Sequence, residues 1–86
     1  MAKKVIKFYA DWCGPCKTYA PIFEGVTKEY DDIEVLNVNI DKDTEGLAAE
    51  YKVRSIPHTV FVSEKGAKRT FTGLMGVDDL KKFIGK

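Results

Sequence analysis

The stretch Ala10-Asp11-Trp12-Cys13-Gly14-Pro15-Cys16-Lys17 contains both cysteines of the 86-residue chain, two residues apart. The run before it, Val5 to Tyr9, is rich in β-branched and aromatic residues and predicts a strand buried on both faces. After it, apolar side chains recur at helical spacing from Gly14 to about Tyr30, which predicts a helix. The two cysteines are therefore expected at a junction between a strand and a helix.

A Cys-x-x-Cys pair at the start of a helix favours redox chemistry. The thiolate is the nucleophile in disulfide exchange, and backbone N–H groups and the helix dipole lower the pKa of a thiol at this position. A purely structural disulfide is one alternative, although closing so short a loop removes only about 2 kcal/mol of unfolded-chain entropy. A zinc site is another, but Cys13, Cys16 and His58 are the only sulfur and imidazole ligands, so a carboxylate would have to be the fourth. Two unreactive buried thiols are the third. A nearby βαβ pattern favours the redox interpretation.

The remaining pattern predicts one α/β domain over residues 1–86. The expected elements are a strand over Ile33 to Ile40, a short helix capped by Asp43 or Thr44 and running through Tyr51, a hairpin of Thr59 to Val62 and Lys68 to Thr72, and a final helix over Val77 to Ile84. The helix between the first two strands is a crossover connection, which predicts that the strands are parallel and that the connection is right-handed. The element order is therefore β-α-β-α-β-β-α.

Composition and charge limit the classes of partner. The formal net charge is +1 and the basic pairs are short and balanced by nearby acids, so nucleic acid is not an expected partner. A hydrophobic content of 44% excludes a disordered chain. No apolar stretch is long enough for a signal peptide or a membrane span, and a lone dithiol motif suits a reducing compartment. These features predict a cytoplasmic protein that does not bind membranes.

The motif Trp12-Cys13-Gly14-Pro15-Cys16-Lys17, with Pro21 after it and Ile56-Pro57 far downstream, resembles the thioredoxin family. The resemblance implies a minimal thioredoxin fold with a four-stranded mixed sheet in the order 2-1-3-4 and helices on both faces. The leading strand and helix of full-length thioredoxins are not expected. It also implies a monomeric protein-disulfide reductase that needs no metal or cofactor beyond its redox-active disulfide. The implied partners are disulfide-containing proteins and a flavoprotein thioredoxin reductase.

Two alternative functions remain open at this point. Glutaredoxins share the short length, which would make glutathione the electron donor, although Gly14-Pro15 is the pair typical of reducing thioredoxins. A non-catalytic module that binds a partner through Trp12, Ile56 and Gly73 is the other alternative, because one fold hosts many functions.

By resemblance, Cys13 is the exposed attacking sulfur and Cys16 the buried sulfur that resolves the mixed disulfide. Gly14 and Pro15 set the turn that brings the two sulfurs together. Trp12 would shield the pair and offer an apolar contact surface, whereas a core tryptophan is the alternative.

Pro57 resembles the proline of the family that faces the cysteines in the cis form. A cis bond would expose the Ile56 backbone for pairing with an extended substrate, and a plain trans turn is the alternative. Gly73 flanks the same groove by resemblance, or is a loop glycine with unusual backbone angles. His58 is interpreted as a strand-starting residue near the rim and not as a catalytic group.

Lys7 is the main departure from the family pattern. It stands where thioredoxins carry a buried aspartate, and Asn37 stands where the lysine partner of that aspartate would be. One hypothesis is that the Lys7 cation favours a thiolate, stabilises the reduced form and makes the disulfide a stronger oxidant. The alternative is that Lys7 extends its ammonium to solvent and has little effect.

Overall fold

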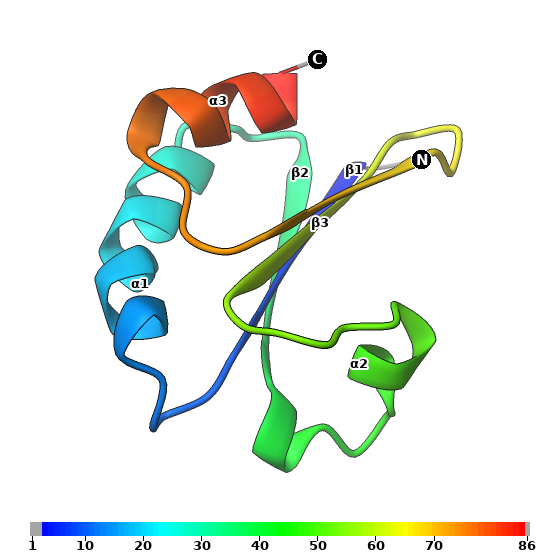
Figure 1. Cartoon of the computed structure of the whole chain (residues 1–86). Coiled ribbons are helices and arrows are strands. Elements are labelled where there is room, and N and C mark those ends of the chain that lie inside the picture. Colours follow the sequence, from blue (N-terminus) through cyan, green and yellow to red (C-terminus); the bar gives the residue numbers. More distant parts are fainter. Residues whose placement is uncertain (1–2, 86) are drawn as a thin grey trace.

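A four-stranded mixed sheet flanked by helices forms the framework of the chain (Figure 1). The structure is a computed structural model that describes residues 3–85. Its elements are β1 (Lys3–Tyr9), α1 (Gly14–Thr27), β2 (Ile33–Asn39), the 3₁₀ helix η1 (Ile40–Lys42), α2 (Leu47–Glu50), β3 (His58–Val62), β4 (Lys68–Thr72) and α3 (Val77–Gly85). Their order is the one predicted from the sequence.

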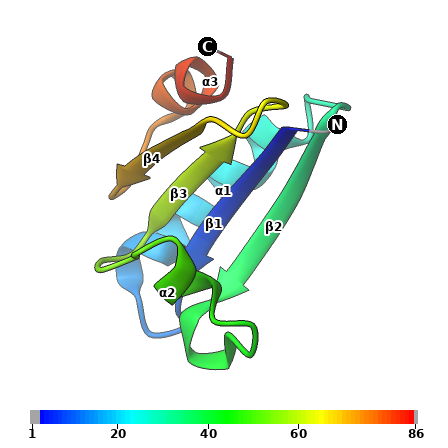
Figure 2. The ribbon, with the colours of Figure 1, turned by 90° about the vertical axis from the view of Figure 1, so that its right-hand side faces the viewer.

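The strand order β2-β1-β3-β4 is also as predicted (Figure 2). β1 and β2 are parallel, with Lys7 opposite Asn37, as the crossover through α1 requires. β1 and β3 are antiparallel, with Lys7 opposite Thr59, and β3 and β4 form the predicted hairpin. β1 is therefore a central strand, and its carboxyl end leads directly to the two cysteines.

Successive residues of β1 point to opposite faces of the sheet, so the strand contributes to two cores. Val5 packs with α1 and α3 in a cluster that includes Phe23 and Leu80. Ile6 and Phe8 pack on the other face, beneath α2. Figure 1 shows the same division, with α1 and α3 on one side of the sheet and α2 on the other. The prediction of a strand buried on both faces is confirmed by the burial of residues 5–8.

Two helices are shorter than predicted. α1 contains Pro21 and ends at Thr27 instead of near Tyr30, because the last amides bond three residues back, as Tyr30 N–H does to the Thr27 carbonyl. α2 covers only Leu47–Glu50. Asp43 still caps this helix, although Gly46 is the residue directly before it. The Asp43 carboxylate accepts hydrogen bonds from the amides of residues 47 and 48, the first two residues of the helix.

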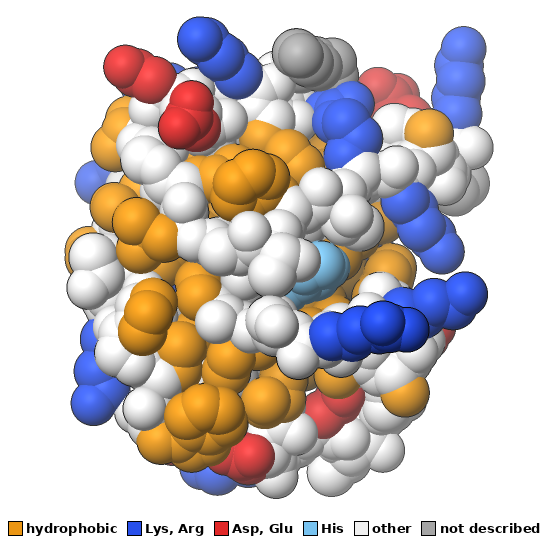
Figure 3. Space-filling model, in the orientation of Figure 1, with side chains coloured by type: hydrophobic (Ala, Val, Ile, Leu, Met, Phe, Trp, Pro, Cys, Tyr) orange, Lys and Arg blue, Asp and Glu red, His pale blue; other side chains and the backbone are white. Residues whose placement is uncertain are grey.

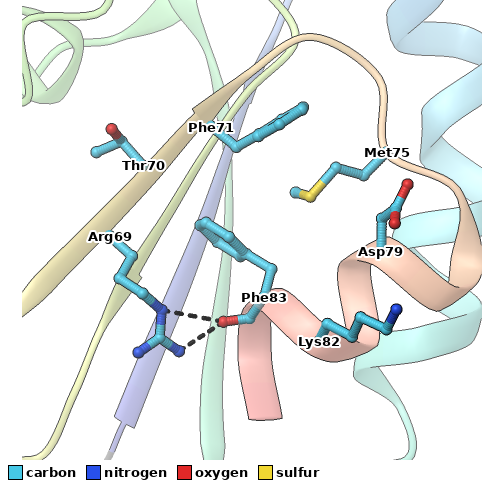
Figure 4. A pocket seen from close by; sticks show the side chains of 7 residues that line it. All are labelled: Arg69, Thr70, Phe71, Met75, Asp79, Lys82 and Phe83. Atoms are coloured by element: carbon cyan, nitrogen blue, oxygen red, sulfur yellow. Dashed lines mark hydrogen bonds between the residues drawn. The ribbon is translucent and has the colours of Figure 1, made fainter. Parts of the chain in front are cut away.

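α3 is held against the hairpin by Arg69 on β4 (Figure 4). The guanidinium Nε donates a 3.1 Å hydrogen bond to the Phe83 carbonyl, one of the carbonyls that the end of a helix leaves without a partner. The same guanidinium lies 4.5 Å from the centre of the Phe61 ring. Arg69, Phe71, Met75 and Phe83 line an open pocket of about 640 Å³ between β4 and α3 (Figure 4).

Within residues 3–85, every helix is too short or too polar to cross a lipid bilayer.

Candidate active site

A disulfide joins Cys13 and Cys16 where β1 gives way to α1. Their Cα atoms lie 5.2 Å apart. Cys13 is the N-cap of α1, with extended backbone angles, and its Sγ accepts a hydrogen bond of 3.2 Å from the Cys16 amide. Gly14 and Pro15 form the first turn, where the N–H that proline lacks would have no partner within the helix. The predicted junction of strand, cysteine pair and helix is therefore confirmed.

Both sulfurs are buried in this disulfide-bonded state. Cys13 is 5% exposed and Cys16 is 3% exposed, so the expectation of an exposed Cys13 is wrong here. The reason is packing, because Tyr9 at the end of β1 and two residues from distant segments, Ile40 and Ile56, all lie against the cysteine cluster. Burial alone does not distinguish the two sulfurs.

Trp12 lies beside the disulfide and is 67% exposed, which contradicts the alternative of a core tryptophan. Its indole Nε1 donates a 2.8 Å hydrogen bond to Asp41 Oδ2, which comes from η1. Trp12, Ile40 and Ile56 line a shallow pocket of about 350 Å³. In Figure 3, hydrophobic side chains collect over the left and lower left of the visible face, while the Lys and Arg side chains lie toward its right and around its edges. Sequence analysis missed the contact with Asp41, since no local pattern links positions 29 residues apart.

The Ile56–Pro57 peptide bond is cis, as predicted. Pro57 is fully buried, and its carbonyl accepts a 2.8 Å hydrogen bond from the Gly73 amide. Gly73 has a φ of 109°, which favours glycine, so its unusual backbone angle and its position beside Pro57 are both observed. The structure therefore brings Ile56, Pro57 and Gly73 together, and Ile56 also packs against the cysteine cluster.

Lys7 lies on the α1 side of the sheet and is only 6% exposed. Its Nζ is 5.1 Å from the centre of the Phe23 ring and 5.3 Å from that of Tyr9. Burial lowers the pKa of Lys7, because water no longer solvates the ammonium, and the charge of Glu24 partly opposes this effect. Lys7 and Cys16 line the same open pocket of about 630 Å³. An ammonium extended into bulk solvent does not fit this burial.

His58 begins β3, as predicted, but it is buried and does not lie at a rim. Its Nδ1 is 2.9 Å from the Thr72 hydroxyl, and burial lowers the pKa of its imidazole. Its Nε2 has no hydrogen-bond partner among residues 3–85. His58 is buried because the sheet register places it between two neighbouring strands, opposite Phe8 of β1 and Thr72 of β4.

A metal site gains no support from the arrangement of side chains. In the part of the chain that the structure describes, no three His, Cys, Asp or Glu side chains are grouped to hold a metal ion. The disulfide itself can take up two electrons and become a dithiol, which is the chemistry of thiol–disulfide exchange.

Several known proteins with similar sequences and structures are thioredoxins. The family model described as thioredoxin matches residues 1–86. A thioredoxin of Mycoplasmoides gallisepticum is 37% identical over 95% of this chain and 81% of its own length. A thioredoxin of Rickettsia typhi is 39% identical over 95% of this chain and 78% of its own. Mitochondrial thioredoxin 3 of Saccharomyces cerevisiae, a solved structure, superposes with a TM-score of 0.85 at 30% identity over 96% of this chain and 76% of its own.

The match extends over the whole chain, and the disulfide occupies the Trp-Cys-Gly-Pro-Cys motif at the start of the first helix. The chain therefore belongs to the thioredoxin family and is a thiol–disulfide oxidoreductase.

Proposed function

We propose that the chain reduces protein disulfides, with Cys13 as the attacking sulfur and Cys16 as the resolving sulfur. In the first step the Cys13 thiolate attacks the target, a bond forms between Cys13 Sγ and one target sulfur, and the other target sulfur leaves as a thiolate. Cys16 then attacks Cys13 Sγ, which releases the reduced target and closes the Cys13–Cys16 disulfide. Two electrons pass from the cysteine pair to the target.

The observation that carries this assignment is the position of Cys13 at the N-cap of α1. Its Sγ already accepts the Cys16 amide hydrogen at 3.2 Å. In the reduced protein the same N–H and the positive end of the α1 dipole would stabilise negative charge on this sulfur. Gly14 and Pro15 support the assignment by shaping the turn between the sulfurs. Cys16 follows in the first turn of the helix, where it is suited to the intramolecular step.

The proposed docking surface for target proteins is formed by Trp12, Ile56, Pro57 and Gly73. Trp12 offers an exposed ring beside the disulfide, and Ile56 packs against the cysteine cluster. The hydrogen bond between Gly73 and Pro57 joins the loop of Ile56 to the loop after β4. An extended segment of the target would pair with the backbone at Ile56, as peptides pair with exposed strand edges. No cofactor is needed in this scheme beyond the disulfide.

The proposed partners are disulfide-containing proteins and a flavoprotein thioredoxin reductase that returns the electrons. We further propose that the protein works as a monomer in the cytoplasm. Electron donation is tested by supplying the oxidised protein with NADPH and a thioredoxin reductase, or with glutathione alone. Turnover with the reductase supports the proposal, whereas turnover with glutathione only would place the protein with glutaredoxin-like enzymes.

The assignment of the two sulfurs is tested by trapping. Cys16→Ser removes the resolving thiol, so a disulfide-bonded model protein such as insulin should accumulate as a mixed disulfide through Cys13. Cys13→Ser is the matched control and should trap little. Efficient trapping by Cys13→Ser and none by Cys16→Ser would reverse the assignment.

A further inference from the structure

The pocket on the α1 side of the disulfide contains a buried amine whose role the scheme above does not explain. Lys7 and Cys16 both line this pocket of about 630 Å³. β1 supplies Lys7 from the centre of the sheet, and the first turn of α1 supplies Cys16. The Cys16 thiol, which must lose its proton, and the Lys7 amine therefore face one open pocket.

The surroundings of Lys7 leave its charge poorly compensated. The rings of Tyr9 and Phe23 lie about 5 Å from Nζ and favour a cation there. Within residues 3–85, no carboxylate oxygen lies within ion-pairing distance of Nζ. The titratable side chains that line the pocket with Lys7 are Tyr9, Asp11, Cys16, Lys17 and Glu24.

The strands on either side supply no charge to the amine. Asn37 of β2 and Thr59 of β3 are the register partners of Lys7. The Tyr19 hydroxyl, which approaches from α1, is bound to Thr59, and burial raises its pKa, so it is uncharged at neutral pH. Glu24 is exposed, and its charge opposes but does not cancel the effect of burial on the pKa of Lys7. A new negative charge on Cys16 would therefore be a strong local partner for Lys7.

We propose that Lys7 is the proton partner of Cys16, so that one proton is shared between the Lys7 amine and the Cys16 thiol. The proposal rests on the proposed function in one respect, namely that Cys16 is the resolving sulfur. In the reduced protein the shared proton lies on nitrogen, which gives a Lys7 ammonium beside a Cys16 thiolate.

The proton and electron balance follows the two steps of disulfide exchange. When the disulfide is reduced, the proton that would make Cys16 a thiol forms an N–H bond on Lys7, so that the sulfur is already a thiolate before resolution. The Cys16 thiolate attacks Cys13 Sγ, the disulfide closes, and the departing target sulfur carries away the electron pair of the broken bond. The Lys7 ammonium then stands beside a neutral disulfide and gives its proton to water or to the departing thiolate. Lys7 is then the neutral amine of the oxidised protein, and it takes up a proton again when the disulfide is next reduced.

Burial makes this cycle directional. Beside the neutral disulfide, desolvation lowers the pKa of Lys7 and favours loss of the proton. Beside a thiolate, the opposite charge raises the pKa of Lys7 and favours retention of the proton. By linkage, the ammonium favours the thiolate to the same extent, so Lys7 stabilises the reduced form and makes the disulfide more oxidising.

The first test uses the unmodified chain, so it does not depend on the folding of a variant. NMR titration of the Lys7 side chain should give a higher pKa in the reduced protein than in the oxidised protein. In Cys13→Ser, which retains only the Cys16 thiol, the high value should persist, and in Cys16→Ser it should be lost. Equal Lys7 titrations in the oxidised and reduced chains would overturn the proposal.

The second test removes the amine. Lys7→Met keeps the length and apolar stem of the side chain, and Lys28→Met, at the exposed C-cap of α1, is the matched control for loss of one positive charge. Measured by thiolate absorbance in a Cys13→Ser background, Lys7→Met should show about tenfold less Cys16 thiolate at neutral pH. In the two-cysteine chain its equilibrium constant with glutathione should shift about tenfold, or about 30 mV toward a more negative potential. Titrations and potentials equal to those of Lys28→Met would contradict the proposal.

A failure of this inference is distinguishable from a failure of the proposed function. If Cys13→Ser rather than Cys16→Ser traps the target, the sulfur assignment is wrong, whatever the Lys7 titration shows. If Cys16→Ser traps the target and the Lys7 pKa does not respond to reduction, the assignment stands and Lys7 is not the proton partner.

Discussion

Trp12 Nε1 donates a 2.8 Å hydrogen bond to Asp41 Oδ2, and this bond ties the loop before α1 to the 3₁₀ helix after β2. The two residues are 29 positions apart, and the bond fixes the orientation of an indole that is 67% exposed beside the disulfide. Asp41 is itself held, because its amide donates to the Asn39 side chain at 2.9 Å. An exposed ring with a fixed orientation binds a partner without first losing rotational freedom.

The first prediction concerns Asp41→Ala, which removes the acceptor of the indole hydrogen bond. A bond of this kind is worth about 0.5–1 kcal/mol, so kcat/KM for a protein disulfide should fall about two- to fivefold. Reduction of a small aromatic disulfide should hardly change, because it needs little contact with the indole. Asp41→Asn keeps an acceptor oxygen and is the control. An unchanged kcat/KM in Asp41→Ala would show that the orientation of Trp12 does not matter for docking.

The second prediction compares two glycines. Gly73 has a φ of 109° and donates its amide to Pro57, so Gly73→Ala should destabilise the protein by about 1–3 kcal/mol through backbone strain. Gly25 lies within α1 with free space for a methyl group, so Gly25→Ala should stabilise the protein by about 0.5–1 kcal/mol. Urea unfolding followed by circular dichroism measures both. Equal effects of the two substitutions would mean that the angle at Gly73 relaxes without cost.

The sequence predicts features that depend on local pattern. The burial of β1 on both faces, the parallel pairing of β1 and β2, and the cysteine pair at the start of α1 all follow from periodicity, connection length and motif position. A βαβ unit has few alternative arrangements, so these local signals fix most of the sheet.

Features that depend on distant contacts were missed or predicted wrongly. The low exposure of Cys13 arises from Ile40 of η1 and Ile56 of the loop before β3, which are far from Cys13 in the sequence. α2 is shorter than its apolar spacing indicates, because Gly46 adopts a positive φ and delays the helix by a turn after Asp43. The burial of Cys13 depends on which segments meet in three dimensions, whereas the positive φ of Gly46 is a local feature that the apolar spacing does not reveal.

The third prediction is a double-mutant cycle on the buried hydroxyl pair of Tyr19 and Thr59, which lie 2.8 Å apart beneath α1. Both side chains are fully buried. Tyr19→Phe or Thr59→Val leaves one hydroxyl buried without a partner and should each cost about 1–3 kcal/mol. The double variant should lose less stability than the two single variants together, since neither hydroxyl is then buried without a hydrogen-bond partner. Urea unfolding at pH 7 measures all three variants, and strict additivity would show that the hydroxyls are not coupled.

The fourth prediction concerns acid pH and the single histidine, whose pKa is lowered because His58 is buried. The unfolded chain binds a proton on His58 near pH 6.5, whereas the folded chain resists it until a lower pH. The stabilisation is therefore complete above pH 6.5 and is lost as pH falls through the folded pKa. One proton contributes a slope of at most about 1.4 kcal/mol per pH unit.

The measurement is the free energy of unfolding between pH 7.5 and pH 5.5 for the native chain and for His58→Thr, which places a second hydroxyl opposite Thr72. The slope over this range should be smaller in His58→Thr, whatever its absolute stability, because the carboxyl groups titrate alike in both chains. The imidazole signals of the native chain give an independent check, since no other histidine is present. A folded-state pKa at or above 6.5 would mean that water reaches Nε2 and that burial does not penalise the imidazolium.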